Sequence, residues 1–307
     1  MIILLVLLLL LLAVSYICYR MVFYVPDQNP EDVISVPDTE QYAPYKNQCA
    51  KMIKNVLAIP YEEVWIQADD GIRLFGKYYE TSHGAPLQIM FHGYRSAGER
   101  DFCGGLPCAL ERGYNVLLVD QRAHGKSGGK CLTFGIKERY DCLTWINYAV
   151  ERFGAETKIF LYGLSMGAAT VLMATELELP SNVKAVVADC GYSSPADIVK
   201  KVMKDRHYPV WLLYPVVRLG GIVFGGFDME SAGASGAMIN CRIPVLFIHG
   251  EDDRFVPCDM SRENFRLCAS EKKRILTVPG AAHGISYMVD KITYLKELDS
   301  FLESISQ

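Results

Sequence analysis

A serine flanked by glycines, at residues 163–167 (GLSMG), carries the clearest chemical signal in this sequence of 307 residues. The pattern G-x-S-x-G is typical of a nucleophile elbow, a strained turn that places a serine between a strand and a helix. An apolar run at 158–162 precedes Ser165, and a helical pattern at 168–177 follows it. We therefore expect Ser165 to be a nucleophile, with the free N–H groups of the new helix beside it.

A second match to the same pattern lies at residues 125–129 (GKSGG). Ser127 in this match stands several residues beyond its strand and lacks the strand-turn-helix setting, so we interpret it as part of a turn. The segment also resembles the end of a phosphate-binding loop, but such a loop needs a glycine where this sequence has Asp120. The sequence thus argues against nucleotide binding.

A serine hydroxyl is a weak nucleophile and needs a general base, for which histidine is the best suited side chain. His283 lies in segment 280–284 (GAAHG), between the last expected strand and the last expected helix. The other histidines lie in turns, at strand ends or in a long insertion: His83, His92, His124, His207 and His249. We expect His283 to be the base, because the chain order serine, acid, histidine is then the one used with a nucleophile elbow.

An acid that orients the histidine should follow a strand shortly before the last one. Segment 249–257 (HGEDDRFVP) comes at the end of such a strand. Three carboxylates, on Glu251, Asp252 and Asp253, compete there. The logic of a catalytic triad alone does not choose between them.

An oxyanion hole needs two backbone N–H donors, one of them on the residue after the nucleophile, which is Met166 here. The second should come from the loop after the third strand, at 91–94 (FHGY). We expect the N–H of Tyr94 to be this donor, because Gly93 lets the backbone turn in closely. The alternative is an ordinary tight turn.

From Tyr61 onward, short apolar runs alternate with longer helical patterns, which is typical of a mostly parallel sheet covered on both faces. Eight strands are expected, at 62–68, 73–80, 87–91, 115–119, 158–162, 183–188, 244–249 and 274–278. Helical patterns fall between most of them, at 101–112, 137–153, 165–177, 259–269 and 285–304. The first two strands should form an antiparallel hairpin, because a turn-forming Asp-Gly joins them.

Residues 192–241 are too many for a simple crossover between two strands. Bulky apolar side chains in their first part are followed by a glycine-rich part. We interpret this insertion as a mobile cap over the site. The alternative is an ordinary pair of packing helices, because aromatic residues at helical spacing usually belong to a core.

Residues 1–20 form an apolar segment whose first 18 residues carry no charged side chain. Its length nearly spans a hydrocarbon core, so we expect a single-pass anchor in a lipid bilayer. A cleaved signal peptide is the alternative, but the basic N-terminal region and the small-residue cleavage site are missing. Arg20 is the only basic residue close to this segment. By the positive-inside rule it favours a catalytic domain on the cytoplasmic side of the membrane, although a domain on the other side fits too.

The anchor is followed by a proline-bearing linker at 21–60, which contains a helix-like stretch at 45–57 that we expect to pack partly on the domain. Residues 61–307 then form the expected catalytic domain. The 31 basic and 35 acidic side chains give a net charge of -4 and form no run of like charge. This distribution argues against a nucleic-acid partner.

Ten cysteines are many for a cytosolic enzyme, yet they show no paired C-x-x-C spacing. We interpret most of them as small buried apolar residues. The alternatives are a zinc site or disulfides, for example between Cys103 and Cys108.

Five ordered motifs together resemble the bacterial α/β-hydrolase family, and most of all its serine aminopeptidase-like or monoacylglycerol-lipase-like branch. They are the elbow and the segments 92–94 (HGY), 120–128 (DQRAHGKSG), 250–257 (GEDDRFVP) and 282–284 (AHG). The resemblance extends from about Tyr61 to Phe301. It implies the α/β-hydrolase fold, an α/β architecture in which helices flank a mostly parallel eight-stranded sheet and a helical cap is inserted.

In that family the acid is the aspartate three residues before a Val-Pro pair, which the resemblance assigns to Asp253. The family's D-x-R-x-H-G-x-S-x-G turn is structural, and Ala123 stands where that turn usually has glycine. The resemblance also implies hydrolysis of esters or amides without naming a substrate.

We expect a serine hydrolase that cleaves carboxylic esters of small molecules through an acyl-enzyme, with no metal and no organic cofactor. The same residues would serve a peptidase or amidase acting on a short peptide. A binding protein that has kept the fold without catalysis is a third possibility.

Overall fold

The computed structural model describes residues 1–26, 35–36 and 40–306, and a sheet of eight strands lies at its centre. The strands are β1 (Glu62–Gln67), β2 (Arg73–Tyr79), β3 (Leu87–Phe91), β4 (Asn115–Asp120), β5 (Ile159–Leu164), β6 (Val183–Asp189), β7 (Val245–Gly250) and β8 (Lys273–Val278). The eight expected strands are confirmed, with ends that differ by one or two residues at most.

The strand order is β1-β2-β4-β3-β5-β6-β7-β8. β2 pairs antiparallel with β1 and with β4, and every other neighbouring pair is parallel. β3, β4 and β7 are buried along their whole length, as apolar strands covered on both faces must be. The mostly parallel sheet predicted from the sequence is therefore present, and β5 carries the elbow at its carboxyl end.

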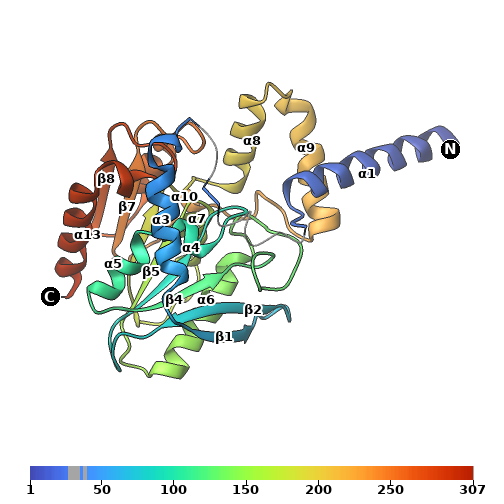
Figure 1. Ribbon diagram of the computed structural model, residues 1–307. Coiled ribbons are helices and arrows are strands. Elements are labelled where there is room, and N and C mark those ends of the chain that lie inside the picture. The colour runs from blue at the N-terminus through green and yellow to red at the C-terminus, as the bar shows by residue number, and fades with distance from the viewer. Residues whose placement is uncertain (27–34, 37–39, 307) are drawn as a thin grey trace.

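Helices cover both faces of the sheet and enclose two apolar cores (Figure 1). One core takes side chains from α6 (Glu138–Phe153) and α7 (Met166–Ala174). The other takes them from α3 (Lys46–Leu57), α5 (Gly105–Glu111) and α13 (Lys291–Ser306). α11 (Cys258–Leu267) follows β7 and lies where the pattern at 259–269 predicted a helix.

Two of the expected helices are each divided in two. The pattern at 101–112 corresponds to α4 (Gly98–Asp101) and α5, because a glycine pair separates them and Gly104 packs directly against the ring of Tyr287. The pattern at 285–304 corresponds to α12 (Ser286–Val289) and α13. Asp290 leaves helical geometry between these two, and its carboxylate accepts a hydrogen bond from the Thr293 N–H at 3.0 Å.

The insertion at 192–241 contains α8 (Pro195–Asp205), α9 (Val210–Gly220), a π-helical turn η2 (Gly221–Gly225) and α10 (Ala234–Met238). α10 packs against α7 and α11 and so belongs to the body of the domain. α8 and α9 stand at one side of the domain, where α9 packs against the N-terminal helix (Figure 1).

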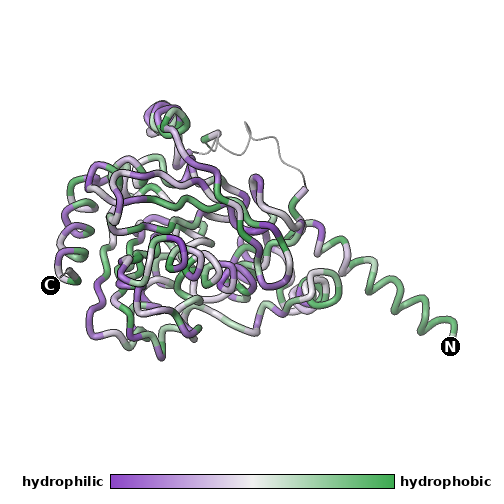
Figure 2. The backbone as a smooth tube through the Cα atoms, turned by 90° about the horizontal axis from the view of Figure 1, so that it is seen from below, coloured by the Kyte–Doolittle hydropathy of each residue, from purple (hydrophilic) through white to green (hydrophobic). Residues whose placement is uncertain are grey.

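The N-terminal helix α1 (Ile2–Val22) projects away from the domain in both overall views (Figures 1 and 2). It is long and apolar enough to cross a membrane, with a mean hydropathy of 3.0 in a window that is only 11% buried. In Figure 2 almost its whole length has the green colour of hydrophobic residues. The same properties fit a signal sequence, so the helix establishes a candidate anchor and no more.

The linker enters the domain directly after α1. Phe23 and Val25 are buried in the core, and Tyr24 forms a β-bridge with Cys131. Further along, a 3₁₀ turn η1 (Ala43–Tyr45) leads into α3, close to the helix expected at 45–57. Two of the linker's prolines, in segments 27–34 and 37–39, lie outside the described residues.

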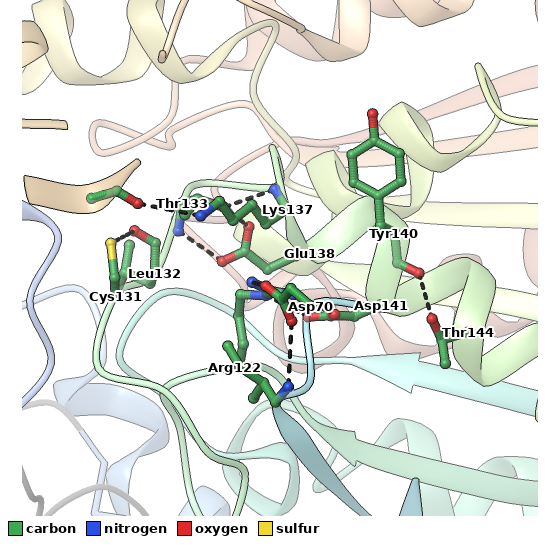
Figure 3. Close-up of polar contacts among 12 residues, drawn as sticks. Asp70, Arg122, Cys131, Leu132, Thr133, Lys137, Glu138, Tyr140, Asp141 and Thr144 are labelled. Carbon is green, nitrogen blue, oxygen red and sulfur yellow. Dashed lines mark hydrogen bonds and ion pairs between the residues drawn. The ribbon is translucent and has the colours of Figure 1, made fainter. Parts of the chain in front are cut away.

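A mostly buried cluster of ion pairs and hydrogen bonds holds the loop that contacts the residues just after α1 (Figure 3). The guanidinium of Arg122 donates two hydrogen bonds of 2.6 Å to Asp141 and one of 2.8 Å to Asp70. Glu138 accepts from the backbone of Thr133 at 2.7 Å and from the backbone of Gly135 at 2.8 Å. These bonds hold a loop that also contacts the linker. The Leu132 N–H of this loop donates a hydrogen bond to the carbonyl of Phe23.

Candidate active site

Ser165 occupies the turn between β5 and α7 in a backbone conformation that side chains rarely adopt. Its φ of 56° and ψ of -113° are those of a strained residue, as a nucleophile elbow requires. Neither glycine of the motif tolerates a side chain: a Cβ on Gly163 would overlap the backbone of Gly167, and one on Gly167 would overlap the carbonyl of Phe91. The glycine spacing therefore follows from how closely α7 approaches the sheet.

His283 reaches Ser165 from the loop between β8 and α12. Its Nε2 lies 2.9 Å from the Ser165 hydroxyl oxygen, and its Nδ1 lies 2.6 Å from Oδ2 of Asp253. The backbone carbonyl of His283 accepts a hydrogen bond of 2.7 Å from the Tyr42 hydroxyl, which steadies the loop. The hydroxyl, imidazole and carboxylate chosen from the sequence thus come together in one hydrogen-bonded chain.

Asp253 is the one of the three competing carboxylates that contacts the imidazole. Its side chain is buried, and Oδ1 accepts hydrogen bonds of 2.9 Å from the backbone N–H groups of Phe255 and Val256. Burial alone would raise the pKa of this carboxyl, but the imidazoles of His283 and His249 outweigh it and hold the pKa well below its usual range. Asp252 and Glu251 are exposed to solvent.

His249 is a second imidazole at the acid that sequence reasoning did not assign to the site. Its Nε2 lies 3.1 Å from Oδ2 of Asp253 and 2.8 Å from the carbonyl of Val256, while its Nδ1 lies 2.7 Å from the Ser261 hydroxyl. The ring is completely buried, so it acts as a fixed support for Asp253. The only signal for it in the sequence is its place at a strand end, four residues before that aspartate.

The two expected oxyanion donors flank Ser165 in the structure, one as the next residue in the chain and the other in the loop after β3. Met166 is the first residue of α7, and among the described residues neither its backbone N–H nor that of Tyr94 has a partner. Gly93 brings the second loop close: a Cβ there would lie 3.3 Å from Cβ of Ser165. The arrangement has the free N–H pair that a developing oxyanion needs.

The loop that carries Tyr94 is held by Asp101, another residue that the sequence did not single out. Its Oδ2 accepts a hydrogen bond of 2.7 Å from the Gly93 N–H, and its Oδ1 accepts one of 2.5 Å from the Ser96 hydroxyl. The N–H of Arg95 donates to Nε2 of His124 at 3.0 Å. Burial lowers the pKa of His124 to about 3, so this imidazole stays neutral and keeps accepting the bond.

Replacing Asp101 by alanine is expected to lower kcat about 10-fold to 100-fold with little change in KM, because the loop that aims the Tyr94 N–H loses its anchor. Steady-state hydrolysis of a p-nitrophenyl ester measures both constants. Ser96→Ala removes one bond to Asp101 but leaves its bond to the Gly93 N–H, so it should cost less. A rise in KM alone for Asp101→Ala would show that Asp101 binds substrate instead of positioning the loop.

A cavity of about 200 Å³ opens beside Ser165 and His283. Much of its wall is apolar or aromatic, with Phe102, Leu164 and Tyr287 among the lining residues. Part of the wall comes from the linker, through Val36, Tyr42 and Cys49. No described residue of the insertion at 192–241 lines this cavity, and α9 packs at the side against α1, so the expected cap over the site stays a prediction.

Asp189 is a buried carboxylate on the wall of the same cavity, at the end of β6. Its Oδ2 accepts a hydrogen bond of 3.0 Å from the Tyr294 hydroxyl, and its Oδ1 has no partner among the described residues. Burial raises the pKa of Asp189 to about 6, and the Tyr294 hydroxyl and the nearby imidazoles offset this effect only in part.

Asp189→Asn is expected to flatten the pH dependence of stability. An aspartate in the unfolded chain has a pKa of about 4. Between pH 4 and pH 6 the carboxyl of Asp189 is therefore protonated in the folded state and ionised in the unfolded state. The free energy of unfolding of the native chain should therefore fall by about 3 kcal/mol across this window and stay level above it. Guanidinium unfolding in detergent at pH 4 and pH 7 measures both proteins; equal slopes would contradict the assignment.

The second G-x-S-x-G match has a structural place, as the sequence predicted. The Ser127 hydroxyl donates to the carbonyl of Asp120 at 2.6 Å and accepts from the N–H of Phe75 at 2.8 Å, so both of its hydrogen-bonding roles are taken.

All ten cysteines are free thiols, so Cys103 and Cys108 are not joined. Within residues 1–26, 35–36 and 40–306, no cluster of histidine, cysteine and acidic side chains suits a metal ion.

Known proteins are similar to this chain over most of its length. Residues 86–220 match the family model described as alpha/beta hydrolase fold. The uncharacterized protein YqkD of Bacillus subtilis is 24% identical over 301 residues, covering 96% of this chain and 94% of YqkD. Protein bem46 of Schizosaccharomyces pombe is 26% identical over 253 residues, covering 79% and 76%.

Among solved structures, the Pyrococcus furiosus esterase Pf2001 superposes with a TM-score of 0.68 at 22% identity, covering 92% of this chain and 98% of the esterase. At this identity the likeness establishes the fold, and the expected eight-stranded sheet with flanking helices agrees with it.

Proposed function

We propose that this chain, which has the α/β-hydrolase fold, is a serine hydrolase that cleaves carboxylic ester bonds. The observation that carries the proposal is the unbroken contact from the Ser165 hydroxyl through His283 to Asp253, at 2.9 Å and 2.6 Å. A buried carboxylate, an imidazole and a hydroxyl in this order are the parts of a catalytic triad.

In the proposed mechanism, Ser165 attacks the acyl carbonyl while Nε2 of His283 takes the hydroxyl proton. Asp253 holds the Nδ1–H of the imidazole, keeps Nε2 free as the base and stabilises the imidazolium that forms. His283 then gives the proton to the leaving alkoxide, which departs as an alcohol and leaves an acyl-enzyme. Water attacks this ester by the same route, with His283 as base, and releases the acid.

The oxyanion of each tetrahedral intermediate lies between the backbone N–H groups of Tyr94 and Met166. Each such donor contributes on the order of 10² to 10³ in rate, because it is already oriented toward the place where charge develops. The N-terminus of α7 adds its positive dipole end at the same point. Asp101 and His124 act only by keeping the Tyr94 loop in place.

An ester is the substrate that the cavity favours. Its apolar and aromatic wall suits an acyl chain, and a volume of about 200 Å³ suits a short to medium one. The esterase described for Pyrococcus furiosus is in keeping with this assignment. The apolar part of the wall comes from the body of the domain and from the linker.

A peptidase or amidase is the second candidate, and the carboxylate of Asp189 on the cavity wall favours it, since an acid there suits a substrate amine. Hydrolysis of a p-nitrophenyl ester series, measured beside aminoacyl-naphthylamides, separates the two candidates. The proposal expects turnover of the esters with a preference for short or medium chains. Turnover of the amides alone would replace the esterase by the amidase.

We also propose that α1 anchors the protein in a lipid bilayer as a single membrane-spanning helix. Its 21 residues reach about 31 Å at 1.5 Å each, which matches a hydrocarbon core. Tyr16, Tyr19 and Arg20 close its C-terminal end with the aromatic and basic side chains that suit a membrane interface.

A further inference from the structure

We propose that α9 and η2 form a second membrane contact, lying in the interface of the bilayer beside the point where α1 enters it. The inference rests on the proposed anchor and goes beyond it, because it assigns a lipid partner to a separate part of the chain. The experiment below tests the two assignments separately.

One face of α9 and η2 is apolar and exposed. The side chains of Trp211, Leu212, Ile222 and Val223 are 80%, 51%, 45% and 49% exposed, and Pro215 between them is exposed too. Residues four or eleven positions apart lie on the same face of a helix, as 211 and 215 or 212 and 223 do, so these side chains form one stripe. Tyr214, Val217 and Gly221 on the other face are buried.

This exposed stripe is continuous with the anchor. Gly220 lies against α1 so closely that a Cβ there would be 2.5 Å from the carbonyl oxygen of Ser15. The ring of Phe224 meets that of Tyr16 edge-on at 5.1 Å and lies 6.0 Å from that of Tyr19. A small residue at a helix crossing and aromatic rings at one level are typical of packing at a membrane.

The length and the ends of the segment decide how it meets the bilayer. α9 and η2 contain 11 and 5 residues, about 24 Å in helical form, which is shorter than a hydrocarbon core of about 30 Å. Val199 and Met203 before the segment and Phe227 and Met229 after it are buried in the domain. Both ends therefore return to the domain, and the segment lies in the interface without crossing.

Charge on and beside the segment agrees with an interfacial position. Arg218 is its only charged residue, and it is neutralised by Asp228 at 2.6 Å and Glu230 at 2.5 Å. Just before the segment, Lys204 and Arg206 are exposed, while Asp205 between them is paired with Lys201 at 2.5 Å. An apolar face with basic side chains at its edge is the pattern of a helix that lies on a membrane with anionic lipids.

The end of the proposed anchor, α1, has a direct connection to the loop of the proposed oxyanion hole. The Tyr94 hydroxyl donates to the carbonyl of Val22 at 3.0 Å, and the guanidinium of Arg95 donates to the carbonyls of Met21 and Tyr24 at 3.1 and 2.9 Å. The loop that carries Tyr94 thus contacts the last turn of α1 and the residue Tyr24 beyond it, so the proposed oxyanion hole lies close to the proposed anchor.

Tryptophan fluorescence of the full-length chain in vesicles tests the proposal. The chain has three tryptophans, so Trp65→Phe with Trp145→Phe leaves Trp211 as the only reporter. The vesicles contain phosphatidylcholine and phosphatidylglycerol, with or without a spin label at a shallow acyl position. We expect the spin label to lower Trp211 emission at least about 2-fold, as for a side chain 5–10 Å below the headgroups, and iodide to have little effect.

Trp65 provides the matched control, since it is 39% exposed and lies on β1, away from the anchor. In the variant Trp145→Phe with Trp211→Phe, iodide and not the spin label should quench Trp65. If Trp145→Phe does not fold, Trp65→Phe alone gives the same comparison, because Trp145 is only 1% exposed and iodide does not reach it.

Flotation of the same vesicles on a sucrose gradient tests the anchor independently. Protein that floats while iodide quenches Trp211 would leave the anchor in place and overturn the role of α9. Floating protein in which Trp211 is protected from both quenchers would show that a second copy covers the stripe, and would overturn it as well. Protein that fails to float would overturn both the anchor and the second contact.

Discussion

Ser165→Ala is expected to lower kcat for a p-nitrophenyl ester by about 10⁶-fold and to abolish labelling by a fluorophosphonate probe. The hydroxyl at 2.9 Å from His283 is the only nucleophile that the proposed mechanism uses, and alanine leaves the base with nothing to deprotonate. Because the methyl group of alanine fits the space of the serine side chain, the fold should remain intact. Initial rates and gel-based probe labelling measure the effect.

The chain supplies its own control in Ser127, the serine of the second G-x-S-x-G match. Ser127→Ala leaves the buried N–H of Phe75 without its acceptor, so it should cost about 1–3 kcal/mol of stability while probe labelling persists. Loss of labelling in a folded Ser127→Ala variant, or labelling that survives Ser165→Ala, would exclude the proposed nucleophile. An inactive wild-type chain that no probe labels would instead indicate a binding protein of this fold.

Asp253→Asn is expected to lower kcat by about 10⁴-fold, because an asparagine does not hold the Nδ1–H tautomer that leaves Nε2 of His283 free as a base. The carboxylate contacts Nδ1 at 2.6 Å, and its depressed pKa keeps it ionised throughout the neutral range. KM should change little, since the carboxylate is buried behind the imidazole. Steady-state kinetics on the ester series measure both constants.

Asp252→Asn is the matched control for this prediction. Asp252 is the neighbouring aspartate and was an equal candidate on triad logic, but its side chain is exposed to solvent. Its replacement should change kcat by less than about 3-fold, as for most surface substitutions. A large effect at Asp252 with a small one at Asp253 would move the orienting acid by one residue and contradict the geometry described above.

The local parts of the structure followed directly from the sequence. The eight strands, the elbow and the apolar N-terminal helix each depend on side-chain patterns within about 20 residues, and such patterns act through burial and backbone sterics nearby. Asp253 is different, since only a resemblance separated it from Asp252 and Glu251, and its contact with His283 supports that choice. The helix divisions near Gly104 and Asp290 were missed, because a helical pattern continues across both.

The supporting residues of the site were beyond the reach of the sequence. Asp101, His249 and Asp189 have no motif; each matters through a partner that the fold brings to it, such as the Gly93 N–H for Asp101. The role of 192–241 also stayed open. Bulky apolar residues at helical spacing are equally typical of a cap, a core or a membrane-facing stripe, and only the packing of α9 on α1 separates these cases.

The sequence by itself determined which chemistry is available. It contains a serine in an elbow motif, a set of acids and a histidine, in the chain order that the α/β-hydrolase fold uses, and an apolar N-terminal segment. Tertiary structure decided which of these groups meet. Ser165 and His283 are 118 residues apart, and their contact depends on β5 and β8 ending at the same edge of one sheet. Strand order is set by packing of the whole core, so no window of the sequence contains it.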